Sequence, residues 1–188
     1  MKGVPEDLSP DLARRLDAEL APGERLVWVG QPRPDLATRP AYFLVPFGVV
    51  FTAFALLWTA GALCLSAGLL APCGLPFVAV GAGLIASPVW LRRRARETLY
   101  ALTDRRAVVW EPGWFGSVAV RSYSAPGLGR MSRHERADGS GDLVFEEFTT
   151  VSHTGDGPHT STTRRGFLAI DDVHAVEDLV RRTLLGGG

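Results

Sequence analysis

The amino-acid sequence predicts an α+β fold: a two-helix transmembrane hairpin plus a small antiparallel β-domain closed by a C-terminal amphipathic helix. Three observations predict it. Residues 41–91 carry no charged side chain over 51 positions. Short strand-like segments separated by turn residues follow, and an apolar stripe at helical spacing ends the chain. We therefore expect a cytoplasmic N-terminal helix and strand at 1–40, the hairpin at 41–91, and a cytoplasmic β-domain at 92–188.

Charge is segregated along the chain. Residues 1–40 carry six basic and seven acidic side chains, and residues 97–188 carry ten basic and thirteen acidic. Surfaces that bind nucleic acid need clustered Lys and Arg, so the mildly acidic C-terminal part argues against a nucleic-acid partner. Nineteen Arg against one Lys indicate a GC-rich bacterial genome.

The uncharged stretch is too long for one membrane helix and suits two. A bilayer core about 30 Å thick needs roughly 20 helical residues. Proline and glycine residues at 68–76 interrupt any continuous helix, so the predicted helices run from about 42 to 66 and from about 75 to 91. A buried helical pair in a soluble protein is the competing hypothesis, and it is disfavoured because soluble cores rarely extend this far without a charge.

Small residues predict where the two helices approach each other. Ala79, Gly83 and Ala86 lie on one face of the second helix and would allow close packing. Cys64 and Cys73 lie in or beside the uncharged stretch. A disulfide at the outer end of the hairpin is one interpretation, and two small apolar side chains without a bridge is the favoured one.

Basic residues predict the orientation of the hairpin. Arg33 and Arg39 precede the first helix, four arginines follow the second, and the turn between the helices has none. The positive-inside rule therefore predicts a multi-pass protein of the plasma membrane with both termini in the cytoplasm. The topology signal accounts for the four arginines by itself. They are also the candidate site for anionic lipid headgroups, at about 1 kcal/mol per base, and comprise Arg92, Arg93, Arg94 and Arg96.

The N-terminal part predicts a helix with one apolar face. Ser9 is expected as the N-cap and Pro10 as the first helical residue. Leu12, Leu16 and Leu20 recur at four-residue spacing on one face. That face would lie either on the membrane surface or against the β-domain, and packing is the commoner arrangement.

A short strand follows at 25–29. Because two membrane spans return the chain to the side it left, this strand shares a compartment with residues 97–185. We predict that it packs on or extends the sheet of the β-domain, with Trp28 buried against that sheet.

Turn residues divide the C-terminal part into strands. Asp104 is expected to form a turn between strands at 98–103 and 106–110. The sequence Asp-Gly-Ser-Gly at 138–141 predicts a second hairpin, between strands at 130–136 and 142–148. A further strand is expected at 117–123.

The end of the chain predicts a loop, a strand and a helix. Residues 149–163 are rich in Thr, Ser, Gly and His and are predicted to form a mobile loop before a last strand at 165–170. Asp171 is expected to cap the final helix. The apolar stripe of that helix comprises Val173, Val176, Val180 and Leu184.

No catalytic residue, cofactor or metal site is predicted. His153 and His159 flank Asp156, but their spacing matches no metal-ligand pattern. Glu146 and Glu147 are neighbours on a strand and point to opposite faces, so they cannot share one reacting centre. Transport is disfavoured because ion-coupled transporters normally need an ionisable residue within the membrane.

Several segments resemble the bacterial pleckstrin-homology-like (bPH) domains, many of which follow a pair of membrane helices. They are LYALTDRRAVV at 99–109, GDLVF at 141–145, and GFLAI at 166–170 leading into the last helix. The segment GERLVWVGQP at 23–32 is similar to the one that often precedes the membrane helices. The resemblance implies a bent antiparallel sheet closed by a C-terminal helix, and it implies no catalytic residue and no cofactor.

The sequence leads to two functional hypotheses. The first is a non-enzymatic module anchored in the lipid bilayer, which binds an unknown protein partner or forms a homo-oligomer at the cytoplasmic face of a bacterial plasma membrane. The second is recognition of anionic lipid headgroups by the arginine cluster and the near sheet edge. An enzyme is a distant third and would depend on His153 or His159.

Overall fold

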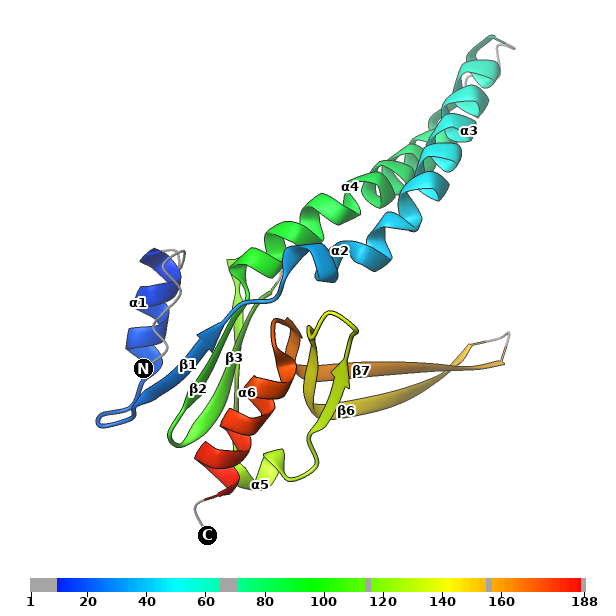
Figure 1. Cartoon of the computed structure of the whole chain (residues 1–188). Coiled ribbons are helices and arrows are strands. Elements are labelled where there is room, and N and C mark those ends of the chain that lie inside the picture. The colour runs from blue at the N-terminus through cyan, green and yellow to red at the C-terminus, as the bar shows by residue number, and fades with distance from the viewer. Residues whose placement is uncertain (1–9, 65–70, 114–115, 155–156, 187–188) are drawn as a thin grey trace. The chain divides into compact units, whose positions relative to one another are not determined.

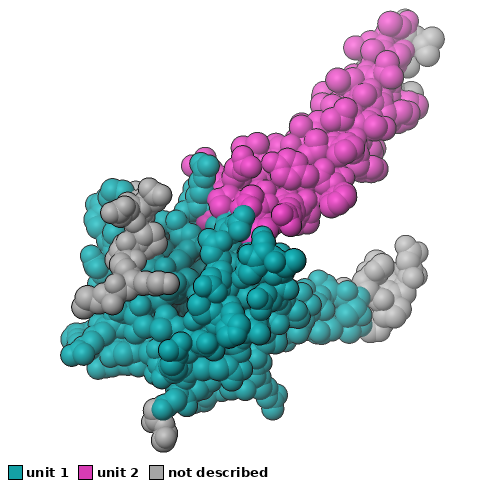
Figure 2. Space-filling view, viewed as in Figure 1, with its two compact units in different colours: residues 1–33, 96–188 teal, residues 34–95 magenta. Residues whose placement is uncertain are grey.

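The computed structural model describes residues 10–64, 71–113, 116–154 and 157–186. The chain forms two compact units, which Figure 2 distinguishes by colour. One unit combines residues 1–33 with residues 96–188, and the other consists of residues 34–95. We call them the sheet unit and the helical unit.

In its described residues, the sheet unit contains two antiparallel sheets and three helices (Figure 1). The first sheet has the order β1-β2-β3-β4, with bounds Leu26–Gly30, Leu99–Thr103, Arg106–Pro112 and Val118–Ser124. The second has the order β5-β6-β7, with bounds Ser132–Glu135, Gly141–Thr154 and Gly157–Ile170. The helices are α1 (Pro10–Glu19), α5 (Ala125–Leu128) and α6 (Val173–Val180), which continues as a π-helical turn, η3 (Arg181–Leu185).

Strand β1 extends the first sheet, as the sequence predicted. It pairs antiparallel with β2, from Leu26 opposite Thr103 to Gly30 opposite Tyr100. Trp28 is half-buried against the core, and its ring centroid lies 5.2 Å from that of Phe167. The strands that precede and follow the helical unit are therefore hydrogen-bonded neighbours.

Helix α1 covers one face of the first sheet. Leu12 and Leu16 are buried against a cluster formed by β1, β2 and β3. Of the two arrangements that the leucine spacing allowed, the structure has packing against the β-domain. Ser9, the predicted N-cap, lies outside the described residues.

The opposite face of the same sheet is covered by the second sheet and α6, as Figure 1 shows. Strands β2 and β3 are consequently buried on both faces. This explains why their sequences, LYALT and AVVW, are almost continuously apolar instead of alternating with polar residues. The central cluster comprises Tyr100, Leu102, Ala107, Val109, Leu128, Leu143, Phe145, Phe167, Ile170, Val173, Val176 and Val180.

The two predicted hairpin turns are confirmed. Asp104 and Arg105 connect β2 to β3. Residues 136–140 connect β5 to β6, where the left-handed backbone of Gly139 (φ 78°) suits a residue without a Cβ atom.

The predicted loop at 149–163 is wrong. Strands β6 and β7 are each 14 residues long and run through this segment, with Thr149 opposite Thr162 and Val151 opposite Thr160. The polar composition was misleading because Thr and Val are β-branched and favour strands. Residues 155 and 156 lie outside the described residues.

The cap of α6 is Asp172, one residue after the predicted Asp171. The Asp172 carboxylate accepts a hydrogen bond from the Ala175 amide at 3.3 Å. Helix α6 begins at Val173, so the residue immediately before it is the one in position to accept from the first turn. Asp171 instead accepts a hydrogen bond from Arg33.

The helical unit contains α2 (Pro34–Tyr42), α3 (Leu44–Cys64), a 3₁₀ turn η1 (Ala71–Gly74) and most of α4 (Leu75–Glu97). Helices α3 and α4 are each long and apolar enough to cross a membrane. Only 11% of the residues in each apolar window are buried, whereas the core helix of a soluble protein is mostly buried. Helix α4 also continues past its predicted end at 91, through the arginine cluster. Cys64 and Cys73 are free thiols.

Helices α3 and α4 pack through small residues, but not through the predicted ones. Ala79, Gly83 and Ala86 are exposed. The buried positions recur every seven residues and are Gly48, Ala55 and Ala62 on α3 and Gly81, Pro88 and Ala95 on α4. A seven-residue repeat keeps the same two faces together along a pair of right-handed helices that wind around each other with a left-handed supercoil. Small residues occupy both candidate faces of α4, so composition could not choose between them.

Replacement of Gly81 by Val is expected to force α3 and α4 apart. A Cβ atom on Gly81 would lie 2.1 Å from Thr52 Oγ1 and 3.1 Å from the Gly48 carbonyl oxygen, while one on Gly83 would meet nothing within 4 Å. Overpacking of this kind costs roughly 1–3 kcal/mol. Thermal unfolding of the full chain in detergent, followed by circular dichroism, should give a lower midpoint for Gly81→Val and an unchanged midpoint for Gly83→Val. Equal effects would show that the wrong face of α4 has been assigned.

Candidate interaction surfaces

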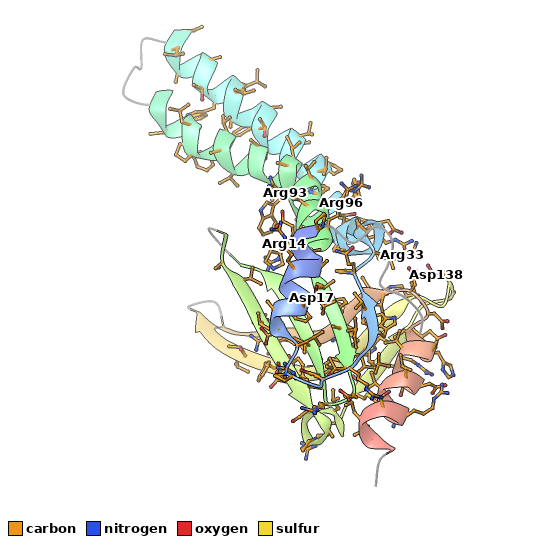
Figure 3. All side chains as sticks on the ribbon, turned by 90° about the vertical axis from the view of Figure 1, so that its left-hand side faces the viewer. Arg14, Asp17, Arg33, Arg93, Arg96 and Asp138 are labelled. Atoms are coloured by element: carbon orange, nitrogen blue, oxygen red, sulfur yellow. The ribbon has the colours of Figure 1, made fainter. Side chains whose placement is uncertain are left out.

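The four predicted headgroup-binding arginines lie in the last two turns of α4. Arg92, Arg93 and Arg96 are exposed, and Figure 3 labels two of them. Arg94 is half-buried, with its Cζ atom 5.4 Å from the centroid of the Trp90 ring, a cation–π geometry. Positive charge is therefore concentrated where the apolar part of the helix ends.

Gln31 joins the segment that leaves the sheet unit to the segment that returns to it. Its side-chain Nε2 donates to the carbonyl oxygens of Arg96, at 2.9 Å, and Thr98, at 3.3 Å. Gly30 also lies opposite Tyr100 in the sheet. Both connections to the helical unit therefore leave from the same end of the first sheet.

Arg33, the last residue before the helical unit, is fixed to two turns of the second sheet. Its guanidinium lies 3.2 Å from Asp171 and 3.7 Å from Asp138, and Figure 3 shows Arg33 beside Asp138. A hydrogen bond from the Ser140 hydroxyl is the main cause that lowers the pKa of Asp138, and Arg33 adds to it.

The backbone of Arg33 is bound to a strained residue. Ala169 has a left-handed backbone, with φ 54°, which costs of order 1 kcal/mol for a residue other than glycine. Its amide donates to Asp142 Oδ1 at 2.7 Å, and its carbonyl accepts from the Arg33 amide at 2.7 Å. Hydrogen bonds on both sides thus hold Ala169 in this conformation.

A buried carboxylate joins the N-terminal segment to the β2–β3 hairpin. The Glu24 side chain is fully covered. It accepts hydrogen bonds from Arg106 Nε at 2.9 Å, Arg106 Nη2 at 3.1 Å, Thr103 Oγ1 at 2.7 Å and the Ala21 amide at 2.8 Å. The Arg106 guanidinium is the largest influence on the Glu24 carboxyl and, against the opposing effect of burial, its hydrogen bonds lower the pKa of Glu24 to about 2.

Asp104, predicted as a turn residue, also binds the N-terminal segment. Its Oδ1 accepts from the Arg25 amide at 2.9 Å, and its own amide donates to the Arg25 carbonyl at 3.0 Å. The segments 23–32 and 99–109, which the sequence singled out separately, are therefore partners in space. The contacts of Glu24 and Arg33 were missed because sequence patterns do not tell which distant motifs meet.

The other candidate groups do not form a site within the described part of the chain. His134 is exposed, and His174 lies 3.6 Å from Asp178 as an exposed pair. His153 and His159 lie on β6 and β7, but their side chains are not among those that the structure describes. Among described residues, no three His, Cys, Asp or Glu side chains are close enough to hold a metal ion.

The helical unit has an apolar groove of about 290 Å³. Its lining comprises Phe51, Phe54, Ala55, Trp58, Cys73, Gly74 and Phe77.

Comparisons of the chain with protein families, curated proteins and solved structures found no match. Function is therefore inferred from the residues and their geometry.

The contribution of Glu24 to stability should disappear in acid. Because its pKa is lowered from 4.5 to about 2 on folding, the ionised carboxylate stabilises the fold above about pH 4.5, and this stabilisation is lost as the pH falls towards 2. At about 1.4 kcal/mol per pKa unit, the effect is of the order of 3 kcal/mol. Glu24→Gln should therefore lower the melting temperature at pH 7 and have little effect near pH 2.

Glu147→Gln is the matched control, since Glu147 forms an exposed ion pair with Arg164 at 3.2 Å. Surface pairs contribute about 0–1 kcal/mol, so this variant should melt like the wild type at both pH values. A Glu24→Gln defect of the same size at pH 7 and pH 2 would contradict the assignment.

Proposed function

We propose that this chain is a membrane-anchored, non-enzymatic module that binds a protein partner or self-associates at the cytoplasmic face of a bacterial plasma membrane. Helices α3 and α4 form its anchor. The sheet unit is the part that interacts.

The pairing of β1 with β2 is the observation that carries the proposal. The helical unit is inserted between these two adjacent strands. An excursion that starts and ends on neighbouring strands must return to the face of the membrane from which it left. This supports a hairpin with both chain ends on one side, and the arginines that flank the hairpin favour the cytoplasmic side.

The resemblance to bPH domains is the second support. It implies a bent antiparallel sheet closed by a C-terminal helix. The sheet unit has two antiparallel sheets, and α6 packs into the cluster between them, which is compatible with that expectation. We therefore also propose that the chain is a bPH-like membrane protein.

Anchoring can be tested by extraction of membranes with alkaline carbonate. The full chain should stay in the pellet because two apolar helices cross the bilayer. Release into the supernatant would refute the anchor.

The native cysteines provide a probe of topology. Cys64 ends α3 and Cys73 precedes α4, so a membrane-impermeant maleimide should label both from outside in intact cells. In a Cys64→Ser, Cys73→Ser background, a cysteine at Thr150 should be labelled only after the membrane is permeabilised. The reverse pattern would show that the proposed orientation is wrong.

Recognition of anionic headgroups is the second candidate function. The exposure of Arg92, Arg93 and Arg96 beside the Arg94–Trp90 pair favours it, because bases close to a membrane surface attract anionic lipid. Binding should be measured on the full chain, since residues 97–188 alone lack β1, one of the two strands that pair with β2.

The triple replacement of Arg92, Arg93 and Arg96 by Gln should reduce the phosphatidylglycerol that co-purifies with the chain. The matched control removes the same charge elsewhere, by replacement of Arg130, Arg181 and Arg182 with Gln, and should retain the lipid. High salt should weaken retention by the wild type. Equal lipid content in the two variants would exclude a headgroup site at the cluster.

A further inference from the structure

Strands β6 and β7 project from the sheet unit as an arm (Figures 1 and 2). Strand β5 pairs with β6 only from Gly141 to Val144. From Phe145 onwards, the outer edge of β6 has no neighbouring strand among the described residues, while its inner edge pairs with β7 along its length. The arm is thus a two-stranded ribbon whose β6 edge has no partner strand among the described residues.

Beyond the irregularity at Phe145 and the charged residues Glu146 and Glu147, the outer edge of β6 lacks the usual protection of an edge strand. Proteins protect such edges with charged side chains, proline or bulges. Residues 148–154 contain no charged residue and no proline. Strand β7 has a similar charged pair at the base of the arm, Arg164 and Arg165 opposite Glu147 and Glu146, but it also carries Pro158 near its start. The β6 edge is therefore the one able to accept another strand.

Exposed apolar side chains lie on the same strand. Phe148 is 41% exposed and Val151 is 50% exposed. Thr149 and Thr150 between them are exposed as well. An isolated two-stranded ribbon is only marginally stable in water, and a third strand stabilises it.

We propose that the outer edge of β6 pairs antiparallel with the same edge of a second copy of this chain. The inference rests on the proposed function, because both copies must be held in one membrane. The free stretch 145–154 has its midpoint at Thr149 and Thr150, so a two-fold axis normal to the sheet brings one of these residues opposite itself. Antiparallel pairing places the two sheet units at opposite ends of the joined arms, where their bulk does not clash.

Charge supports a second copy as the occupant. The acidic residues of the arm, Glu146 and Glu147, lie at its base. In a two-fold pairing centred on Thr149 or Thr150, neither faces the same residues of the other copy, so no like-charge pair is created. Pairing of β6 edges in the parallel sense would bring these carboxylates together.

The size of the contact explains why confinement is needed. Pairing of a few residues buries less than the roughly 1,200 Å² found at the low end of specific interfaces. Such a contact is weak between molecules that diffuse freely. Anchoring in one bilayer raises the effective concentration of each arm for the other, so pairing is favoured in membranes and lost on dilution.

Disulfide cross-linking of the full chain in membranes tests this pairing. In a Cys64→Ser, Cys73→Ser background, cysteine replaces Thr149, Thr150 or Ser161. Residues that face each other in an antiparallel pair have Cα atoms about 4.5–5.5 Å apart, within the range of a disulfide. Mild oxidation should give a covalent dimer for Thr149→Cys or Thr150→Cys. Ser161 lies opposite Thr150 on β7, so Ser161→Cys is the matched control and should stay monomeric.

A charged residue on the edge should abolish the cross-link. Val151→Lys, added to the Thr150→Cys variant, places two ammonium groups diagonally across the axis and should reduce the dimer at least tenfold. Pairing centred on Thr149 would place residue 151 opposite Glu147, so the Thr149→Cys variant takes Thr150→Lys instead. Thr160→Lys adds the same charge on β7, opposite Val151, and should leave the dimer unchanged. Dilution of the protein with excess lipid should also reduce the dimer.

The outcomes separate this inference from the proposed function. The pairing of β6 edges would be overturned by any of three results. These are no covalent dimer from either Thr149→Cys or Thr150→Cys, a dimer from Ser161→Cys, or an equal loss of dimer with lysine on β6 and lysine on β7. Carbonate extraction of the same variants reports on the anchor independently. A chain that stays in the membrane without cross-linking refutes the pairing and leaves the anchor intact, whereas a chain released by carbonate refutes the proposed function.

Discussion

The pairing of β1 with β2 is the constraint on which the arrangement of the chain depends. These strands are separated in sequence by the whole helical unit, yet they are adjacent in one sheet. Closing so long a loop has an entropic cost. It is offset by main-chain hydrogen bonds, by Trp28 against the core, and by the buried contact of Glu24 with Arg106. Once these contacts form, both connections to the helical unit leave from the same end of the sheet.

Burial on both faces of β2 and β3 follows from this closure. The N-terminal segment supplies α1 to one face, and the second sheet with α6 covers the other. Two hydrogen bonds hold the segment that leaves the sheet unit. Gln31 donates to the carbonyl of Arg96, where the chain re-enters the unit, and the amide of Arg33 donates to the carbonyl of the strained residue Ala169. The segment 10–30 and the C-terminal part therefore share one core. A fragment without the N-terminal segment would lose strand β1 and also helix α1, which covers one face of the first sheet.

Local chemistry explains which elements the sequence predicted well. The helix at Pro10, the turns at Asp104 and Gly139, and the apolar stripe of α6 depend on neighbours in the chain, and they occur as expected. The segment 149–163 was misjudged because polarity suggested a loop, while Thr supplies the β-branched carbon that favours strands. The N-cap of α6 is Asp172 and not the predicted Asp171, because the helix begins at Val173 and helix boundaries are uncertain by one or two residues.

The sequence by itself determined two long helices with apolar spans, the absence of charge from residues 41–91, and the strand 25–29 as a partner of the C-terminal sheet. These follow from composition and from the rule that two spans return a chain to its starting side. Tertiary structure decided the rest. Packing decides which face of α4 is buried. Gly81, Pro88 and Ala95 lie on that face, whereas Ala79, Gly83 and Ala86 are similarly small and are exposed, so composition alone could not distinguish the two faces. That Glu24 meets Arg106, and Arg33 meets Asp138 and Asp171, depends on how distant turns are brought together, because such contacts are specified by packing and not by local pattern.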